Sequence, residues 1–187
     1  MELIGSVLRL QVQTAPLKPR PSGSGRYDPA PLREVEALEV GPDGCLGDGV
    51  VDVHHAAHPE SRHVRGANGL SVLPVAHYAE MRSRYGSHLA DGAAGENVLL
   101  DTPRRLTAQD LRGPLLLETD GDPLTLTDVL VAAPCLEFSR FCAGRDLGDD
   151  GPEVQAALEF LSHGTRGFYL RVTGSGVVRR GARLLRP

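Results

Sequence analysis

The chain is divided into many short apolar runs by glycine, proline and aspartate residues. Its 187 positions contain 22 glycines and 14 prolines but four tyrosines, four phenylalanines and no tryptophan. Such a composition favours short strands joined by turns over a helical bundle. We interpret nine runs as strands, at residues 2–12, 34–40, 50–53, 70–73, 97–100, 115–118, 124–133, 168–172 and 177–185.

The first run has the period of a half-buried strand. Its apolar residues Ile4, Leu8, Leu10 and Val12 lie on one side at even spacing. Turn residues follow the second run at 41–44 (Gly-Pro-Asp-Gly), which predicts a meander there. A second turn at 174–176 (Gly-Ser-Gly) predicts that the last two runs pair with each other.

Two segments show helical spacing instead. The first covers residues 75–85, with Pro74 where a first-turn proline is tolerated because its missing N–H needs no partner. The second begins near Pro152, has Glu153 beside the positive end of the helix dipole and stops before Gly164. Its apolar stripe consists of Val154, Leu158 and Leu161.

The order of these elements predicts the fold class. Many strands, two helices and no alternating β-α register argue against a doubly wound sheet and for a closed or partly closed β-barrel with a few peripheral helices. The length suits a single domain over residues 1–187. Residues 14–31, rich in proline, and 54–69, rich in histidine, are expected to be long loops.

Charge and cysteine content exclude several functional classes. The formal charge of -4 gives no overall basic field for nucleic-acid binding. No apolar run approaches the ~20 residues that span a bilayer, so we expect no membrane association. The 3 cysteines, an odd number without tight spacing, suit a reducing compartment, and we expect a cytoplasmic protein.

Four histidines and two acidic residues form the densest polar cluster. They are Asp52, His54, His55, His58, Glu60 and His63. Imidazole and carboxylate groups suit a first-row divalent metal, with His54, His58 and His63 as candidate ligands. A polar loop whose histidines are solvated or bind neighbouring backbone is the equal alternative.

Three further segments could carry chemistry. The glycine turn at 92–97 presents Glu96 and Asn97 at the start of a strand, where its backbone N–H groups could face an anion. An ordinary αL turn without a binding role has the same sequence pattern. Cys135 follows Pro134 on a stiff backbone, which suits a metal ligand or sulfur nucleophile, whereas most free cysteines are simply buried. Arg166 and Arg171 flank an aromatic pair, and alternation places Arg171 on a polar face that could bind phosphate, although a solvated barrel exterior is the simpler account.

Taken in order, these segments resemble the MOSC domain, the module named for the C-terminal part of molybdenum cofactor sulfurase. The similarity is carried by Gly44-Cys45-Leu46-Gly47-Asp48, His54-His55, Gly92-Ala93-Ala94-Gly95-Glu96-Asn97, Ala133-Pro134-Cys135 and Gly167-Phe168-Tyr169-Leu170-Arg171-Val172. The chain departs from the family pattern at Ala94, Ala133 and the longer loop after Asp48. The family fold, a β-barrel with a few helices, agrees with the architecture expected above.

The resemblance implies a stand-alone protein that binds molybdenum cofactor. Cys135 would ligate molybdenum or carry sulfur as a persulfide, and some relatives reduce N-hydroxylated compounds with an external electron donor. As a sulfur carrier the protein would instead receive sulfur from a cysteine desulfurase. The implied cofactor-binding residues are Asn97, Glu96, Gly95, His54, Ser71 and Arg171.

Overall fold

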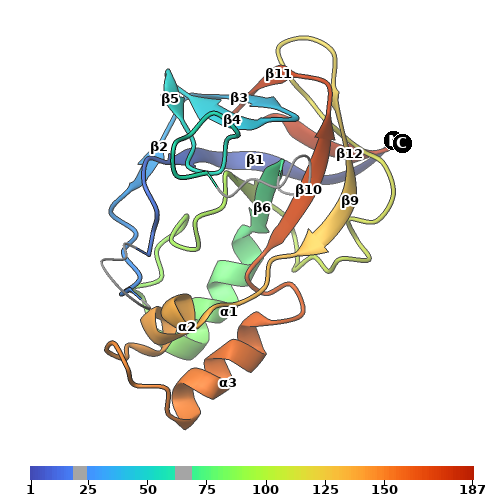
Figure 1. The fold of residues 1–187 in the computed structure, drawn as a ribbon. Coiled ribbons are helices and arrows are strands. Elements are labelled where there is room, and N and C mark those ends of the chain that lie inside the picture. Colours follow the sequence, from blue (N-terminus) through green and yellow to red (C-terminus); the bar gives the residue numbers. More distant parts are fainter. Residues whose placement is uncertain (19–24, 62–68) are drawn as a thin grey trace.

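The fold is a barrel with helices gathered at one end. Residues 1–18, 25–61 and 69–187 are described by the computed structural model. Figure 1 shows the barrel strands above and all three labelled helices below, with the two chain ends close together at the far side. The mainly β barrel predicted from the sequence is confirmed.

Seven strands of the described residues close the barrel. In order around it they are β12 (Arg183–Arg186), β8 (Leu115–Leu117), β9 (Leu124–Val131), β10 (Phe168–Thr173), β6 (Leu70–Pro74), β7 (Val98–Asp101) and β1 (Glu2–Gln13). Pairing of β1 with β12 completes the ring, so these strands have no open edge along the closure. The neighbours are antiparallel except β6 and β7, which run parallel.

A smaller sheet covers one side of the barrel. It contains β11 (Gly176–Arg179), β3 (Ala37–Gly41), β4 (Gly44–Gly47) and β5 (Val50–Val51), while the short β2 (Leu32–Glu34) pairs with β1. The predicted turn at 41–44 is confirmed, because Gly41 faces Gly44 across the hairpin. The predicted pairing of the last two runs is wrong. After the turn at 174–176 the chain leaves the barrel and β11 pairs with β3.

Alternation fills the barrel interior. On β10, Phe168, Leu170 and Val172 are buried, whereas Tyr169 is half-buried and Arg171 is exposed. The same rule places Leu10 of β1 in the core. Burial of such side chains contributes roughly 1.5–3 kcal/mol each and dominates the stability of the fold.

The helices form a second core at the open end of the barrel. Helix α1 (Val75–Tyr85) covers the predicted residues and is the crossover that parallel strands β6 and β7 require. Helix α3 (Pro152–Leu161) was also predicted. Helix α2 (Leu136–Ala143) was not, although Gly144 ends it in the left-handed conformation expected of a C-cap. None of the described helices is long and apolar enough to cross a membrane.

The side chains that fill the second core come from all three helices. They include Tyr78 and Met81 of α1, Phe138 and Cys142 of α2, and Leu161 of α3. In the described parts of the two expected loops, residues 14–18, 25–31 and 54–61, the structure contains no helix or strand.

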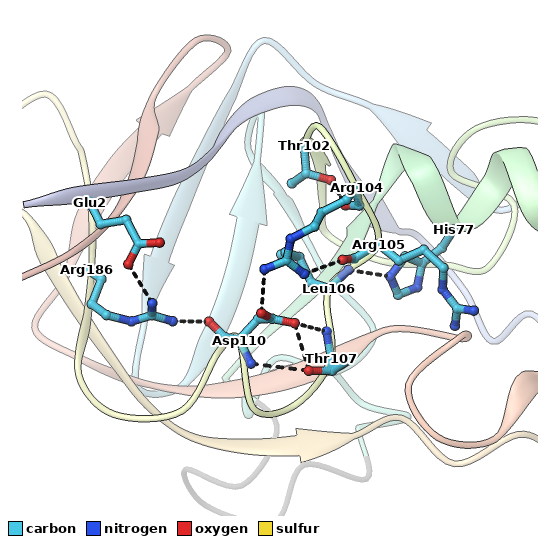
Figure 2. A network of polar contacts seen from close by, with 9 residues as sticks. All are labelled: Glu2, His77, Thr102, Arg104, Arg105, Leu106, Thr107, Asp110 and Arg186. Carbon is cyan, nitrogen blue, oxygen red and sulfur yellow. Dashed lines mark hydrogen bonds and ion pairs between the residues drawn. The ribbon is translucent and has the colours of Figure 1, made fainter.

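A polar network ties α1 to the loop that follows β7 (Figure 2). His77 is fully buried, and its Nε2 accepts the N–H of Leu106 at 3.1 Å. The other ring nitrogen, Nδ1, lies 3.2 Å from the carbonyl oxygen of Thr165 and donates to it. One neutral imidazole therefore satisfies two backbone groups, and burial lowers the pKa of His77.

Ion pairs and hydrogen bonds also connect this loop to the first and last strands, β1 and β12. Asp110 pairs with Arg104 at 2.6 Å and accepts the N–H of Thr107 at 2.7 Å. The hydrogen bond from Arg104 is the main reason why the pKa of Asp110 is well below its ordinary value. Arg186 bridges the carbonyl oxygen of Asp110 and the carboxylate of Glu2, which links the first and last strands (Figure 2).

Replacing His77 tests the role of the neutral imidazole. We expect His77→Leu to destabilise the fold by about 2–4 kcal/mol at pH 7.5, because two buried backbone groups lose their partner. The folded pKa lies below the ordinary 6.5, so the unfolded chain takes up the proton first as pH falls through that value. The free energy of unfolding of the wild type then decreases, whereas that of the leucine variant does not, because leucine binds no proton.

The difference in the free energy of unfolding between the wild type and His77→Leu should therefore be smaller at pH 5.5 than at pH 7.5. Urea unfolding at both pH values measures it. A difference that stays constant would show that the ring is not held neutral.

Candidate functional site

A cavity of about 280 Å³ lies where the barrel meets the helices. Its wall combines the end of β1, the starts of β6 and β10, and the turn that precedes β7. The described residues that line it are Gln13, Pro16, Leu17, Lys18, Tyr27, Val53, His54, Glu60, Ser71, Val72, Ala94, Gly95, Glu96, Ala132, Arg166, Phe168 and Tyr169. Four of the predicted site residues are brought together here: His54, Ser71, Gly95 and Glu96.

The glycine turn at 92–97 is held by two glutamine side chains of β1. The Gln11 amide donates to the carbonyl oxygen of Gly92 at 2.8 Å, and the Gln13 amide donates to that of Gly95 at 2.7 Å. Both glycines have positive φ, 91° and 86°, which other residues rarely adopt. A Cβ at Gly92 would lie 2.4 Å from Gln11 Oε1, so the close approach also requires glycine.

Asn97 lies behind the cavity wall and positions the residues that form it. Its Oδ1 accepts the Ser71 hydroxyl at 2.7 Å, and its Nδ2 donates to Asp52 Oδ2 at 3.1 Å. Asp52 in turn accepts the backbone N–H of Gln13 at 2.7 Å and of His54 at 2.8 Å. The predicted cofactor-binding Asn97 thus has its side chain engaged by the protein itself.

Glu96 brings a buried carboxyl group to the cavity. Its Oε2 accepts the Tyr78 hydroxyl at 2.9 Å, and that hydroxyl accepts the N–H of Ala94 at 2.7 Å. Its Oε1 is buried and has no hydrogen-bond partner within the described part of the chain. Burial raises the pKa of Glu96 to about 7, so the group changes protonation near neutral pH.

Arg166 is the cavity residue that the sequence prediction did not select. Its Nη2 donates to the carbonyl oxygen of Ala94 at 3.2 Å, and its guanidinium lies 5.2 Å from the centre of the Phe138 ring. Burial opposes the charge, but Tyr169, Tyr27 and Cys135 outweigh it and raise the pKa of Arg166. Its Nε is buried without a partner among the described residues.

Arg171, the arginine that the prediction did select, lies elsewhere. It is on the outer face of β10, where its Nε pairs with Asp128 Oδ2 at 3.0 Å, and it is absent from the described cavity lining. Arg166 reaches the cavity because it lies just before β10, in the turn that contains Gly167, and strand alternation gives no signal for such a residue.

Cys135 is the cysteine with solvent access. It is half-buried at the N-cap of α2, whereas Cys45 and Cys142 are buried. Burial raises the pKa of Cys142 to about 12, which keeps that thiol protonated and inert. Cys135 does not contribute to the described lining, but it lies close enough to Tyr27 and Arg166, which do, to interact with them electrostatically.

Glu137, two residues further on, adds a carboxylate beside this thiol. It accepts a hydrogen bond from the Cys135 side chain and lies 3.9 Å from Lys18. Burial raises its pKa, but hydrogen bonds and the Lys18 charge outweigh burial and leave the pKa of Glu137 below its ordinary value. The Glu137 carboxylate therefore has both the Cys135 thiol and the Lys18 ammonium group beside it.

The histidines of the 54–69 loop are divided in the structure. His54 lines the cavity, while His55 Nδ1 and His58 Nδ1 accept the N–H groups of Ala57 and Glu60, each 3.1 Å away. In residues 1–18, 25–61 and 69–187, no group of three or more His, Cys, Asp or Glu side chains could hold a metal ion. His63, the third predicted ligand, lies outside the described residues.

Replacing Glu96 by glutamine tests the buried carboxyl group. The folded pKa of about 7 lies above the ordinary 4.5, so the wild type loses stability as pH rises between these values. Glutamine keeps the acceptor for Tyr78 and has no proton to lose. We expect the variant to gain roughly 3 kcal/mol on the wild type between pH 4 and pH 8. Urea unfolding across this range measures the gain, and parallel profiles would contradict a buried, titrating Glu96.

The comparisons with known proteins agree with this architecture. A model of the MOSC domain matches residues 59–184, which is more than half of the chain. The fold is similar to that of YuaD from Bacillus subtilis, with a TM-score of 0.62, 14% identity and coverage of 96% of this chain and 93% of that one. YiiM from Escherichia coli gives a TM-score of 0.54 and 15% identity, covering 99% of this chain and 69% of YiiM. A search of curated proteins gives no significant match. The chain belongs to the MOSC domain family.

Proposed function

We propose that this protein binds the molybdenum cofactor in the cavity between the barrel and the helices. MOSC domains are commonly associated with this cofactor, a pterin dithiolene with a phosphate or nucleotide end. The observation that carries the proposal is the pair of charged groups in the cavity lining, the half-buried cation Arg166 and the buried carboxyl group of Glu96. Both have a polar atom without a partner in the described chain, which is costly unless a ligand uses it.

The donor set of the cavity fits such a ligand. Arg166 and Lys18 are cations that would bind the phosphate end, because guanidinium and ammonium groups pair with phosphate oxygens. Ser71 and the Gly95 turn add polar groups beside them. Cys135 would supply the thiolate ligand of the metal, a soft donor for a thiophilic ion, from the N-cap of α2 outside the described lining.

The reaction that we propose is a two-electron reduction of an N-hydroxylated compound. The N–O bond breaks, two electrons arrive from an external donor, and two protons complete the amine and water. The bound cofactor supplies the redox chemistry. Glu96, whose pKa is about 7, can hold or release a proton at the cavity wall near neutral pH.

Metal retention tests the cofactor site. The protein is produced in a host that makes the cofactor, and molybdenum is measured by mass spectrometry and pterin by the fluorescence of its oxidised form. We expect both in the wild type, and at least a fivefold loss in Arg166→Gln and in Cys135→Ser. Arg171→Gln is the matched control, because this exposed arginine pairs with Asp128 outside the cavity.

Two results would contradict this proposal. One is the absence of molybdenum and pterin from the wild type. The other is an equal loss in Arg166→Gln and Arg171→Gln, which would mean that the site does not depend on the Arg166 cation. Thermal unfolding of each variant shows whether a loss reflects the site or the fold.

One observation favours a second function, that of a sulfur carrier. Cys135 is half-buried and outside the described lining of the cavity, so a partner protein could reach its thiol without entering the site. The Cys135 thiolate would attack the outer sulfur of a persulfide on a cysteine desulfurase. The new S–S bond forms on Cys135, and the desulfurase cysteine leaves as a thiolate.

Mass spectrometry after incubation with a cysteine desulfurase and cysteine tests the sulfur carrier. We expect the wild type to gain the mass of one sulfur atom, and Cys135→Ser to gain nothing. Cys142→Ser is the control, since a thiol buried in the helical core should not compete. Sulfur found on Cys45 or Cys142, or on no cysteine, would rule this function out.

A further inference from the structure

A second cavity, of about 230 Å³, lies on the other side of Tyr27. It is bounded by α2, by the segment at residues 25–27 and by the loop that follows α2 at residues 144–147. Tyr27 lines both cavities, so they share one wall. The functional assignment above uses the first cavity and leaves this one without a role.

Arg140 supplies an unused hydrogen-bond donor at this second cavity. The residue is 5% exposed, and its Nε and Nη2 both bind Asp150 Oδ1, at 2.7 and 2.5 Å. Its Nη1 is buried and has no partner anywhere in the described chain. A guanidinium held by one carboxylate along one edge keeps its remaining N–H groups for another acceptor.

Two further arginines line the rim and are weakly held. Arg26 lies 3.3 Å from Asp146, with exposed fractions of 78% and 88%, and such a pair contributes little. Arg145 Nη2 lies 3.0 Å from the exposed Glu153. These side chains can turn toward an anion at low cost. The lining thus holds three arginines, and the carboxylate partners of two of them, Asp149, Asp150 and Glu153, lie outside it.

Another part of the cavity lining is aromatic. The Phe141 ring lies 5.2 Å from the Tyr27 ring and 5.5 Å from the edge-on His88 ring, measured between centroids. His88 is fixed there, because its Nε2 is 3.0 Å from the carbonyl oxygen of Phe141. Planar ligands pack well against such surfaces.

We propose that this second cavity binds a small aromatic carboxylate. The carboxylate accepts hydrogen bonds from Arg140 Nη1 and from Arg145 or Arg26, and the ring lies against Phe141 and Tyr27. This site is independent of the molybdenum cofactor, and the purified chain without cofactor should show it.

Titration of the ¹⁵N-labelled protein with benzoate tests the site. We expect a dissociation constant of about a millimolar, as for a ligand of this size, and shifts centred on the backbone amides of Gly25, Gly144 and Leu147. Benzamide, which has the ring without the charge, and benzylamine, which has the opposite charge, should bind at least about tenfold more weakly. Inorganic phosphate should do the same.

Variants connect the binding to the residues. Arg140→Met should weaken benzoate about tenfold, because the charge-assisted hydrogen bonds are lost. Phe141→Leu should weaken it by less and keeps the test informative if Arg140→Met does not fold. Arg112→Gln, an exposed arginine outside the described lining of both cavities, should bind like the wild type.

The proposal is overturned by any of three results. Shifts centred on Ser71, Gly95 and Glu96 would place benzoate in the first cavity. Phosphate or benzamide binding as tightly as benzoate would show that the ring or the charge is not recognised. Equal affinity of Arg140→Met and Arg112→Gln would remove Arg140 from the site.

Discussion

The Asn97 side chain is the interaction on which the site depends. It joins the Ser71 hydroxyl at the start of β6 to the Asp52 carboxylate, which holds the end of β1 and the backbone of His54. Because the amide offers a donor and an acceptor in one plane, it fixes three segments far apart in the sequence. The side chains that face the cavity are therefore oriented before any ligand arrives, which reduces the cost of ordering them on binding.

The charged side chains of the cavity show that this end of the barrel serves a purpose besides stability. Glu96 and Arg166 lie in surroundings that penalise charge, and each leaves a polar atom without a partner in the described residues. An apolar pair of the same size would stabilise this position as well or better. Polar residues at such a place are typical of binding sites, where ligand groups complete their hydrogen bonds.

Much of this architecture could be predicted from the sequence, and the failures have physical causes. Alternating apolar residues and turn residues predicted the barrel strands, and Pro74 with the helical spacing after it predicted α1. Helix α2 was missed because eight residues offer little more than two turns, too few for a clear period. The pairing of β11 was missed because turn residues do not say to which sheet the chain goes next.

The same limit applies to the site. The residues of the glycine turn and His54 were predictable because local chemistry marks them. Arg166 and Lys18 were not, since their positions at the cavity come from contacts with segments remote in sequence, such as Ala94 and Glu137. Strand alternation correctly predicted that Arg171 lies on the outer face of its strand. Alternation does not show whether that face carries a cavity, so it could not tell a binding residue from a solvated one.

The position of Cys135 follows from the helix that the sequence did not reveal. Because α2 begins one residue later, Cys135 is the N-cap residue of this helix, with the Glu137 carboxylate beside its thiol. The direction of a side chain at a helix N-cap is set by the helix that follows and not by the alternation of the preceding strand. The strand pattern over residues 124–133 could therefore predict that the thiol follows a strand, but not where it points.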